Sequence, residues 1–432
     1  MLTRLRNLQI QIWAQFRHVL VWEWLSLCAA PLFLFPYSLP KLTVIALLMT
    51  IFVIFIAYRR GQPLWPRSPF NLPLLIFAFM VLIGMVVAPD KELMLSKATA
   101  LLLGFLIWRF LNVSVNSVET WVFAFWGFLI SGVILTLLTI PGTDWHIKFA
   151  GFSRLARILP TPLVQPIPGG LQMNMVAGML MFLLPATFPL IFAHGTRNLA
   201  SRYLIVLLAF LAVITLIITQ SRSGWIAALT TISGFLVVKS IARWAKKLSL
   251  RGYFLIASVI SLGLLLVAVV IKTGERDVAD LAASEYVGTT DTLEFRLEVW
   301  RWALASIAEY PYTGSGLGNF RELIFRRYPV SLDSSYDIAH AHNIYLQIAL
   351  DLGLPGLISY LAWLILSVYF AAKAVSQIPK ISPPVESLLL CLVAYHLFGL
   401  TDALATGARP SILLWYLLGL MNSFPRTIDQ IR

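Results

Sequence analysis

Long apolar runs, separated by short polar loops, dominate the pattern of this chain. A helix that crosses the hydrocarbon core of a bilayer needs about 20 mostly apolar residues, and such runs recur along most of the 432 residues. The pattern therefore predicts an all-α polytopic membrane protein with about 12 transmembrane helices. We expect these helices at residues 24–39, 41–58, 70–88, 93–111, 119–140, 171–193, 203–219, 223–239, 253–271, 342–372, 385–401 and 410–424.

Two segments depart from the spanning pattern. Residues 1–20 carry apolar residues at helical spacing with arginines among them, which predicts a short interfacial helix on the cytoplasmic surface. Residues 272–341 form a long hydrophilic loop that holds 11 of the 20 acidic residues. We therefore divide the chain into an N-terminal membrane bundle (1–271), a loop domain (272–341) and C-terminal membrane helices (342–432).

Composition and charge fix how the chain is oriented. Only 12% of residues are charged and 59% are hydrophobic, whereas about a quarter are charged in soluble proteins. The net charge of +13 would favour nucleic acid binding in a soluble protein, but here it reports topology and we expect no nucleic acid partner. With both termini cytoplasmic, inside segments hold 18 Lys and Arg residues and short outside loops hold 8. This bias predicts a multi-pass protein of the cytoplasmic (inner) membrane with the long loop outside.

The long loop contains two recognisable elements. We predict a helix around residues 291–309, on which Arg296, Trp300 and Leu304 share a face. A glycine-rich run follows at residues 314–318. No strand–helix–strand context surrounds this run, so it favours a tight turn with positive φ angles over a nucleotide-binding loop.

Polar residues gather where the long loop meets an apolar helix. His340 and His342 lie at this junction, and Asn343, Gln347 and Asp351 follow at i, i+4 and i+8 on one helix face. One interpretation is a helix cap with an interhelical hydrogen-bond network. The functional interpretation makes His342 a general base, because neutral imidazole accepts a proton from a hydroxyl near neutral pH. His340 is the alternative base, although it lies farther out on the loop.

Three arginines from separate segments fall on the same predicted side of the membrane. Arg222 lies between two apolar spans, Arg296 lies on the predicted loop helix, and Arg409 precedes the last span. Each alone could pair with a carboxylate or extend to the interface, but together beside a histidine they indicate an anion site, since guanidinium groups bind phosphate bidentately. Asn174 is a further polar candidate, or else a helix-terminus hydrogen bond. No metal-ligand spacing is evident, so we expect a metal-independent reaction without a cofactor.

From about residue 170 to 425 these motifs resemble the O-antigen ligase/polymerase superfamily. The His-Asn-to-Gly element, which begins at His342, is the most specific part of the resemblance. The superfamily usually has Glu two residues before the first Gly of this element, where this chain has Asp351. The residues that carry the resemblance are Asn174 with Ala177, Ser221-Arg222-Ser223-Gly224-Trp225, Arg296 with Trp300, Pro311, Gly314 to Phe320, His342-Asn343, Tyr345-Leu346, Gly353-Leu354-Pro355-Gly356, Arg409-Pro410, Trp415 and Gly419.

The resemblance implies a GT-C-like glycosyltransferase that takes a glycan from undecaprenyl pyrophosphate outside the cytoplasmic membrane. Ligases pass the glycan to lipid A–core oligosaccharide, and polymerases pass it to another lipid-linked repeat unit. The active histidine of the family then falls on His342, and its pyrophosphate-binding arginines fall on Arg222, Arg296 and Arg409. Asn343, Asn174, His340 and Asp351 are the accompanying polar candidates for substrate binding.

Other functions fit parts of the same pattern. A polymerase of lipid-linked repeats or a protein O-oligosaccharyltransferase would use the same residues with a different acceptor. A polytopic transporter or flippase would also have many spans. We see no internal repeat of the two halves that would favour it, and the arginines gather on one side rather than at the midplane. A scaffold without catalysis would have no evident need for these arginines beside a histidine.

Overall fold

The computed structural model of the chain describes residues 40–145, 147–148, 171–193, 199–244, 293–328, 338–378, 381–404 and 411–424. The predicted spans 24–39 and 253–271, the interfacial helix 1–20 and Arg409 lie outside these residues. The described helices are α3 (Pro40–Arg59), α4 (Asn71–Val87), α5 (Lys91–Ser114), α6 (Val118–Thr139), η1 (Ile140–Gly142), α7 (Met173–Leu180), α8 (Leu184–Ile191), α9 (Leu199–Ile218), α10 (Arg222–Trp244), α12 (Leu293–Glu309), α13 (Phe320–Arg327), α14 (Ile344–Gln377), α15 (Ser382–Phe398) and α16 (Ile412–Asn422).

The described residues form a helical bundle, and their strands are the two-residue pair β1 (Thr143–Asp144) and β2 (Leu171–Gln172). Five segments are long and apolar enough to cross a membrane, and shorter apolar helices accompany them. This architecture supports the predicted all-α polytopic membrane protein, while the total of 12 spans stays a prediction. The five long segments are Lys91–Ser114, Val118–Gly142, Met173–Ile191, Arg222–Ile241 and Ile344–Gln377.

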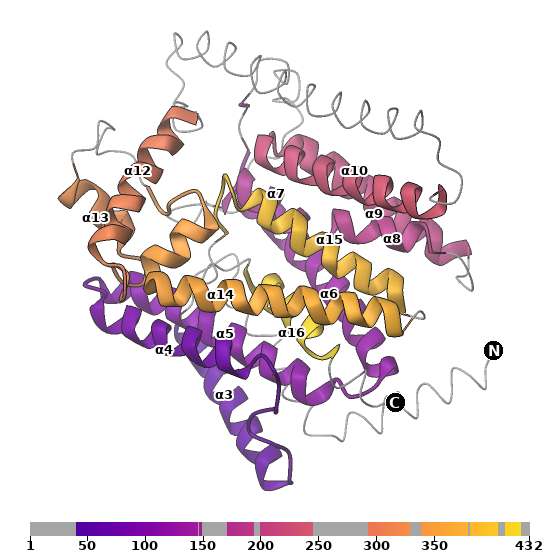
Figure 1. Cartoon of the computed structure of the whole chain (residues 1–432), viewed down its shortest axis with the longest axis horizontal. Helices are drawn as coiled ribbons and strands as arrows, with labels where there is room; N and C mark the ends of the chain where they lie inside the picture. The colour runs from indigo at the N-terminus through magenta and orange to yellow at the C-terminus, as the bar shows by residue number, and fades with distance from the viewer. Residues whose placement is uncertain are drawn as a thin grey trace.

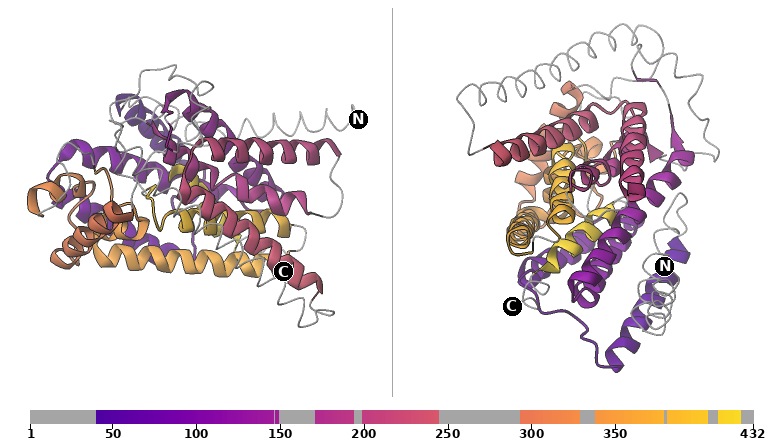
Figure 2. Two further views of the ribbon diagram at one scale, coloured as in Figure 1. Left: turned by 90° about the horizontal axis from the view of Figure 1, so that it is seen from above. Right: turned by 90° about the vertical axis from the view of Figure 1, so that its right-hand side faces the viewer.

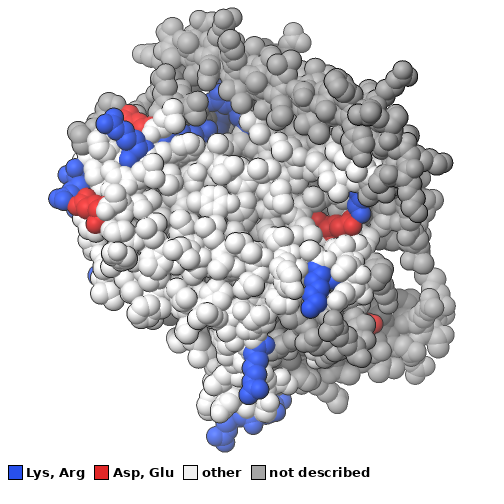
Figure 3. Space-filling view, viewed as in Figure 1, with Lys and Arg blue, Asp and Glu red and all other residues white. Residues whose placement is uncertain are grey.

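The outer surface of the bundle is apolar. Large side chains of α4 and α14 face outward, with Leu75 68% and Ile365 69% exposed. In Figure 3 the charged side chains lie around the margin of the visible face and leave its middle uncharged. A contiguous apolar surface of this kind is unfavourable in water and favourable in lipid.

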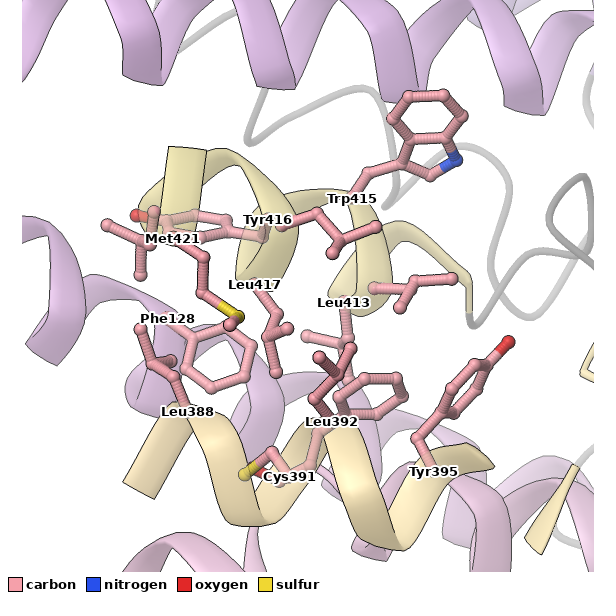
Figure 4. Close-up of a cluster of buried hydrophobic side chains, with 14 of the residues drawn as sticks. Phe128, Leu388, Cys391, Leu392, Tyr395, Leu413, Trp415, Tyr416, Leu417 and Met421 are labelled. Carbon is pink, nitrogen blue, oxygen red and sulfur yellow. The ribbon is translucent and has the colours of Figure 1, made fainter. Parts of the chain in front are cut away.

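The short helix α16 lies at the centre of the bundle. All its residues are buried, and it packs against α5, α6, α14 and α15. Figure 4 shows Leu413, Leu417 and Met421 of α16 facing Leu388, Cys391 and Leu392 of α15. Burial on every side accounts for the apolar character of α16 around its whole circumference.

A buried polar network ties α16 to its neighbours. The side-chain oxygen of Asn422 accepts hydrogen bonds from the indole N–H groups of Trp108 and Trp363. Its amide donates to Ser367 Oγ at 2.8 Å. Each polar group has a partner, so the network links α5, α14 and α16 without an unsatisfied buried donor.

The helix α14 contains one break, at Gly353. This residue has φ 67° and ψ 179°, a combination that is essentially restricted to glycine. The next residue, Leu354, donates its backbone N–H to the carbonyl of Pro311 at 2.7 Å instead of to the helix. Pro355 has no N–H to donate. The segment before the break is therefore a separate short piece of helix that carries the polar junction.

The glycine-rich run packs into this break. Gly314, Gly316 and Gly318 all have positive φ angles, so the predicted tight turn is confirmed. The backbone of Ser315 donates to the Leu350 carbonyl at 2.7 Å. The predicted loop helix is confirmed as well, as α12. In Figures 1 and 2, α12 and α13 lie together at one end of the bundle.

Candidate functional site

Two histidines and one aspartate meet where α14 begins and α15 ends. Nε2 of His340 and Nδ1 of His342 each lie 3.8 Å from Oδ1 of Asp402. The carboxylate is buried, whereas the imidazoles retain 24% and 19% exposure. A substrate can therefore approach the histidines while the carboxylate stays behind them.

Asn343 explains why these residues come together. It is the N-cap of α14, and its Oδ1 accepts the backbone N–H groups of Tyr345 and Leu346 at 2.9 and 3.1 Å. Its Nδ2 donates to the Leu400 carbonyl at 3.0 Å, and the N–H of Ile344 donates to the Gly399 carbonyl at 2.8 Å. These bonds fasten the start of α14 to the end of α15 and so place Asp402 beside the histidines.

The hydrogen bond at Nδ1 sets the tautomer of His340. The backbone N–H of His342 donates to this nitrogen at 3.2 Å, so a neutral His340 carries its proton on Nε2, which faces Asp402. Burial, and then the neighbouring His342, lower the pKa of His340 well below its usual value of 6.5. His340 is therefore neutral at physiological pH and presents a donor to the carboxylate.

The backbone of His342 is in the left-handed region, with φ 47°. This conformation is uncommon for residues other than glycine. The imidazole packs edge-on against the ring of Phe295, with centroids 5.6 Å apart. Non-glycine residues held in sparsely populated backbone regions cluster at functional sites, so the strain itself supports a functional role for His342.

The contact with Phe295 brings the first turn of α12 to the histidines. Arg296 is the next residue, and its charge lowers the pKa of His340. Arg296 Nε is buried and has no hydrogen-bond partner among the described residues. The same holds for Asp402 Oδ2. Buried polar atoms without partners require an explanation, and a bound ligand would supply one.

A second contact brings the first turn of α10 to Asp402. Thr401 Oγ1 donates to Ser223 Oγ at 2.7 Å. Ser223 follows Arg222, the first residue of α10. Arg222 is thus attached, through Ser223 and Thr401, to the segment that carries the buried carboxylate.

Asn174 lies in the first turn of α7 and is held by a lysine. Lys148 Nζ donates to Asn174 Oδ1 at 3.2 Å, and the backbone N–H of Lys148 donates to Gln220 Oε1 at 2.8 Å. Gln220 precedes Ser221-Arg222 in the chain. Lys148 therefore links Asn174 to the turn that leads into α10. We call the group of Asn174, Lys148, Gln220 and Arg222 the corner at Arg222.

Asp351 lies in a separate network beneath the histidine loop. Its carboxylate pairs with Lys97 at 3.0 Å and accepts the N–H of Gly318 and the amide of Gln347, each at 3.0 Å. Gln347 in turn accepts the backbone N–H of Ala341 at 2.9 Å. Asp351 thus connects the glycine-rich run to the residue before His342.

The structure divides the sequence candidates into two groups. His340, His342 and Arg296 share one site, with Arg222 and Asn174 on the adjoining helix ends. The contacts of Asn343 and Asp351 are those of a helix cap and an interhelical network. Arg409 lies outside the described residues, so its part in the site stays a prediction.

Two residues of the site were missed by the sequence reasoning. Asp402 is a lone carboxylate directly after an apolar helix, and ionisable residues at membrane depth are functional candidates; that signal could have found it. Lys148 offers no comparable signal. Its position depends on the pairing of β1 with β2, and strands of two residues are too short to be predicted from the sequence pattern.

One group of side chains could hold a metal ion, although no ligand spacing in the sequence indicates it. His340, His342 and Asp402 have ligand atoms within 4.8 Å of one another, close enough to hold a metal ion. Against this, the bond that Nδ1 of His340 accepts leaves the proton on Nε2, the nitrogen that faces the group. A protonated nitrogen cannot bind a metal ion, so the donor set does not fit a metal in this tautomer.

Comparison with known proteins supports the resemblance. A search of curated proteins finds no match to the chain. Residues 207–361 match the family model described as O-Antigen ligase. This range contains Arg222, Arg296, both histidines and Asp351, and it implies activity of the ligase/polymerase type on lipid-linked glycans in general. This match confirms the predicted resemblance to the O-antigen ligase/polymerase superfamily over residues 207–361.

Proposed function

We propose that the protein is an O-antigen ligase-type glycosyltransferase. It moves a glycan from undecaprenyl pyrophosphate to a hydroxyl of lipid A–core oligosaccharide, outside the cytoplasmic membrane, with inversion and without a metal ion. The observation that carries the proposal is the buried Asp402 carboxylate, which faces His342 and His340. The first turn of α10, with Arg222, and the first turn of α12, with Arg296, contact the segments that carry this carboxylate and His342.

The acceptor hydroxyl requires a base, and His342 fits this role. With its proton on Nδ1 toward Asp402, its Nε2 is the basic nitrogen that accepts the hydroxyl proton. The separation of 3.8 Å from Asp402 exceeds a hydrogen bond, but such contacts are often long before substrate binds. Asp402 then stabilises the imidazolium that forms.

The leaving group requires positive charge, which the arginines supply. The acceptor oxygen attacks the anomeric carbon as the bond from that carbon to the pyrophosphate oxygen breaks, and the electron pair departs with the pyrophosphate. Attack opposite the leaving group inverts the anomeric centre. Arg222 and Arg296 bind the pyrophosphate, and Arg409, which lies outside the described residues, is the third arginine that we expect to bind it. Each such donor can contribute about 3–4 kcal/mol to the transition state.

The predicted topology places this chemistry on the outer side. No ATP is available there, so the transfer draws on the activated lipid-linked donor. The isoprenoid tail lies against the apolar helix faces of the bundle 1–271 and the helices of 342–432, and the loop domain 272–341 covers the glycan.

Glycan transfer by the purified protein in EDTA tests the proposal. The donor is a defined undecaprenyl-pyrophosphate glycan, and the acceptors are lipid A–core, a second donor molecule and an acceptor protein, in separate reactions. Transfer to lipid A–core in EDTA is the expected result. Transfer to the second donor alone makes the protein a polymerase, and transfer to the acceptor protein alone makes it a protein O-oligosaccharyltransferase. Activity that EDTA abolishes and a divalent cation restores contradicts the metal-independent mechanism.

The substitution Asp402→Asn tests the carboxylate. Asparagine keeps the shape and the oxygen that accepts the Ala403 N–H but loses the charge that stabilises imidazolium. We expect kcat to fall by about 10²- to 10⁴-fold with little change in the KM for the donor. Asp144→Asn, at an exposed position in β1, is the matched control. A kcat within about threefold of wild type would remove Asp402 from the mechanism.

A further inference from the structure

Lys148 is a cation at this site for which the mechanism above has no role. It follows β1 along the chain, and its side chain is partly buried. The ammonium donates to Asn174 Oδ1 at 3.2 Å, while the backbone N–H is anchored on Gln220 Oε1 at 2.8 Å. Asn174 therefore holds the ammonium group of Lys148, and Gln220 holds its backbone, at the corner at Arg222.

The strands explain how a loop lysine reaches this corner. β1 pairs with β2 in parallel, with Thr143 opposite Leu171 and Asp144 opposite Gln172. Since α7 begins directly after β2, the pairing brings Lys148 alongside the first turn of α7. The strand pairing therefore accounts for the contact between Lys148 and Asn174.

The anchor residue is itself in an unusual conformation. Gln220 has φ 49° and is only 1% exposed. Together with His342 it makes up the non-glycine residues of positive φ among those described. A buried glutamine held in this way turns its amide oxygen toward Lys148 and starts α10 at Arg222. The strained backbone of Gln220 therefore lies at the residue that holds Lys148 in position.

We propose that Lys148 is a ligand of the departing pyrophosphate, acting with Arg222 on the same phosphate group. The inference rests on the proposed function. The ammonium group has three N–H donors, and one of them binds the amide oxygen of Asn174. Because this amide is neutral, the bond orients the ammonium without neutralising its charge. Lysine binds phosphate as a compact point charge, whereas arginine binds it through a planar fork. Asn174 in this view is a positioning residue that aims the ammonium.

Product inhibition by undecaprenyl pyrophosphate tests this role, with the wild type compared to Lys148→Gln and Lys148→Arg. Glutamine retains hydrogen-bonding capacity toward Asn174 but carries no charge. A hydrogen bond to a charged group corresponds to about 10- to 100-fold in affinity, so we expect the inhibition constant of Lys148→Gln to rise by that factor. Lys148→Arg should restore the constant to within about threefold of wild type. Melting temperatures should be equal for all three proteins.

Lys91→Gln is the matched control. Lys91 is the first residue of α5, and its ammonium donates to the Ala88 carbonyl at 2.8 Å. Its removal should leave the inhibition constant unchanged. Undecaprenol, which has the tail without the phosphates, should inhibit Lys148→Gln and wild type equally, because the inference concerns the phosphates alone.

Three results would overturn the inference, and they are distinguishable. If Lys148→Gln is inhibited like wild type while Arg222→Gln is not, Lys148 is no phosphate ligand and the proposed function stands. If Lys148→Gln has a lower melting temperature as well as a weaker affinity for undecaprenyl pyrophosphate, and Lys148→Arg restores neither, the role of Lys148 is structural only. If the wild type neither transfers glycan nor binds undecaprenyl pyrophosphate, the proposed function and the inference fall together.

Discussion

Replacement of His342 by asparagine is expected to lower kcat for glycan transfer by about 10²- to 10⁴-fold, the usual contribution of a general base. Asparagine accepts the left-handed backbone at this position, where φ is 47°, better than alanine does. It cannot take a proton near neutral pH. The variant should therefore fold normally and bind donor with an unchanged KM. The measurement is kcat in the reconstituted transfer reaction, with melting temperature as the check on folding.

His340→Asn is the matched control for this prediction. His340 keeps its proton on Nε2 and has no lone pair free to accept another (Nδ1 holds the N–H of His342). Its loss should reduce kcat much less than the loss of His342, through a looser Asp402 carboxylate. A larger defect in His340→Asn than in His342→Asn would exchange the two roles. Full activity of His342→Asn would remove His342 from catalysis.

The parts of the site that the sequence predicts are those with local causes. The spacing of Asn343, Gln347 and Asp351 predicts that they share one helix face, and Gln347 donates to Asp351 at 3.0 Å. The positive φ angles of the glycine-rich run follow from the steric freedom of glycine, without reference to the rest of the fold. Periodicity and residue type are sufficient for features of this kind.

The remainder depends on contacts between distant segments. Asp402 reaches His342 because Asn343 donates a hydrogen bond to the Leu400 carbonyl. These two residues lie 57 positions apart, and nothing in the sequence encodes that bond. Lys148 reaches Asn174 only through a parallel strand pair of two residues each. The predicted sidedness of the loops indicates that Arg222 and Arg296 converge. Their neighbours Ser223 and Phe295 now contact the segments that carry Asp402 and His342, which strengthens that inference.

Gly353→Ala is expected to lower the free energy of unfolding by about 2–5 kcal/mol, from backbone strain and the displacement that a methyl group forces. A Cβ at this position would lie 2.5 Å from the carbonyl oxygen of Tyr312 and 2.9 Å from the backbone nitrogen of Gly314. Both are backbone atoms, so no side chain can rotate away. The glycine-rich run must shift, which shows as a lower apparent melting temperature in detergent.

Gly234→Ala provides the contrast, because a Cβ there would meet nothing within 4 Å. Alanine at this helical position in α10 should leave stability unchanged or raise it by up to about 1 kcal/mol. Activity should separate the two variants further. The glycine-rich run packs against Gly353, and its Gly318 N–H binds the Asp351 carboxylate. That carboxylate accepts a hydrogen bond from Gln347, which in turn binds the backbone N–H of Ala341, the residue before His342. Gly353→Ala should therefore lose transfer activity even below its melting temperature. Wild-type activity at reduced stability would mean that this chain of bonds does not position the histidine.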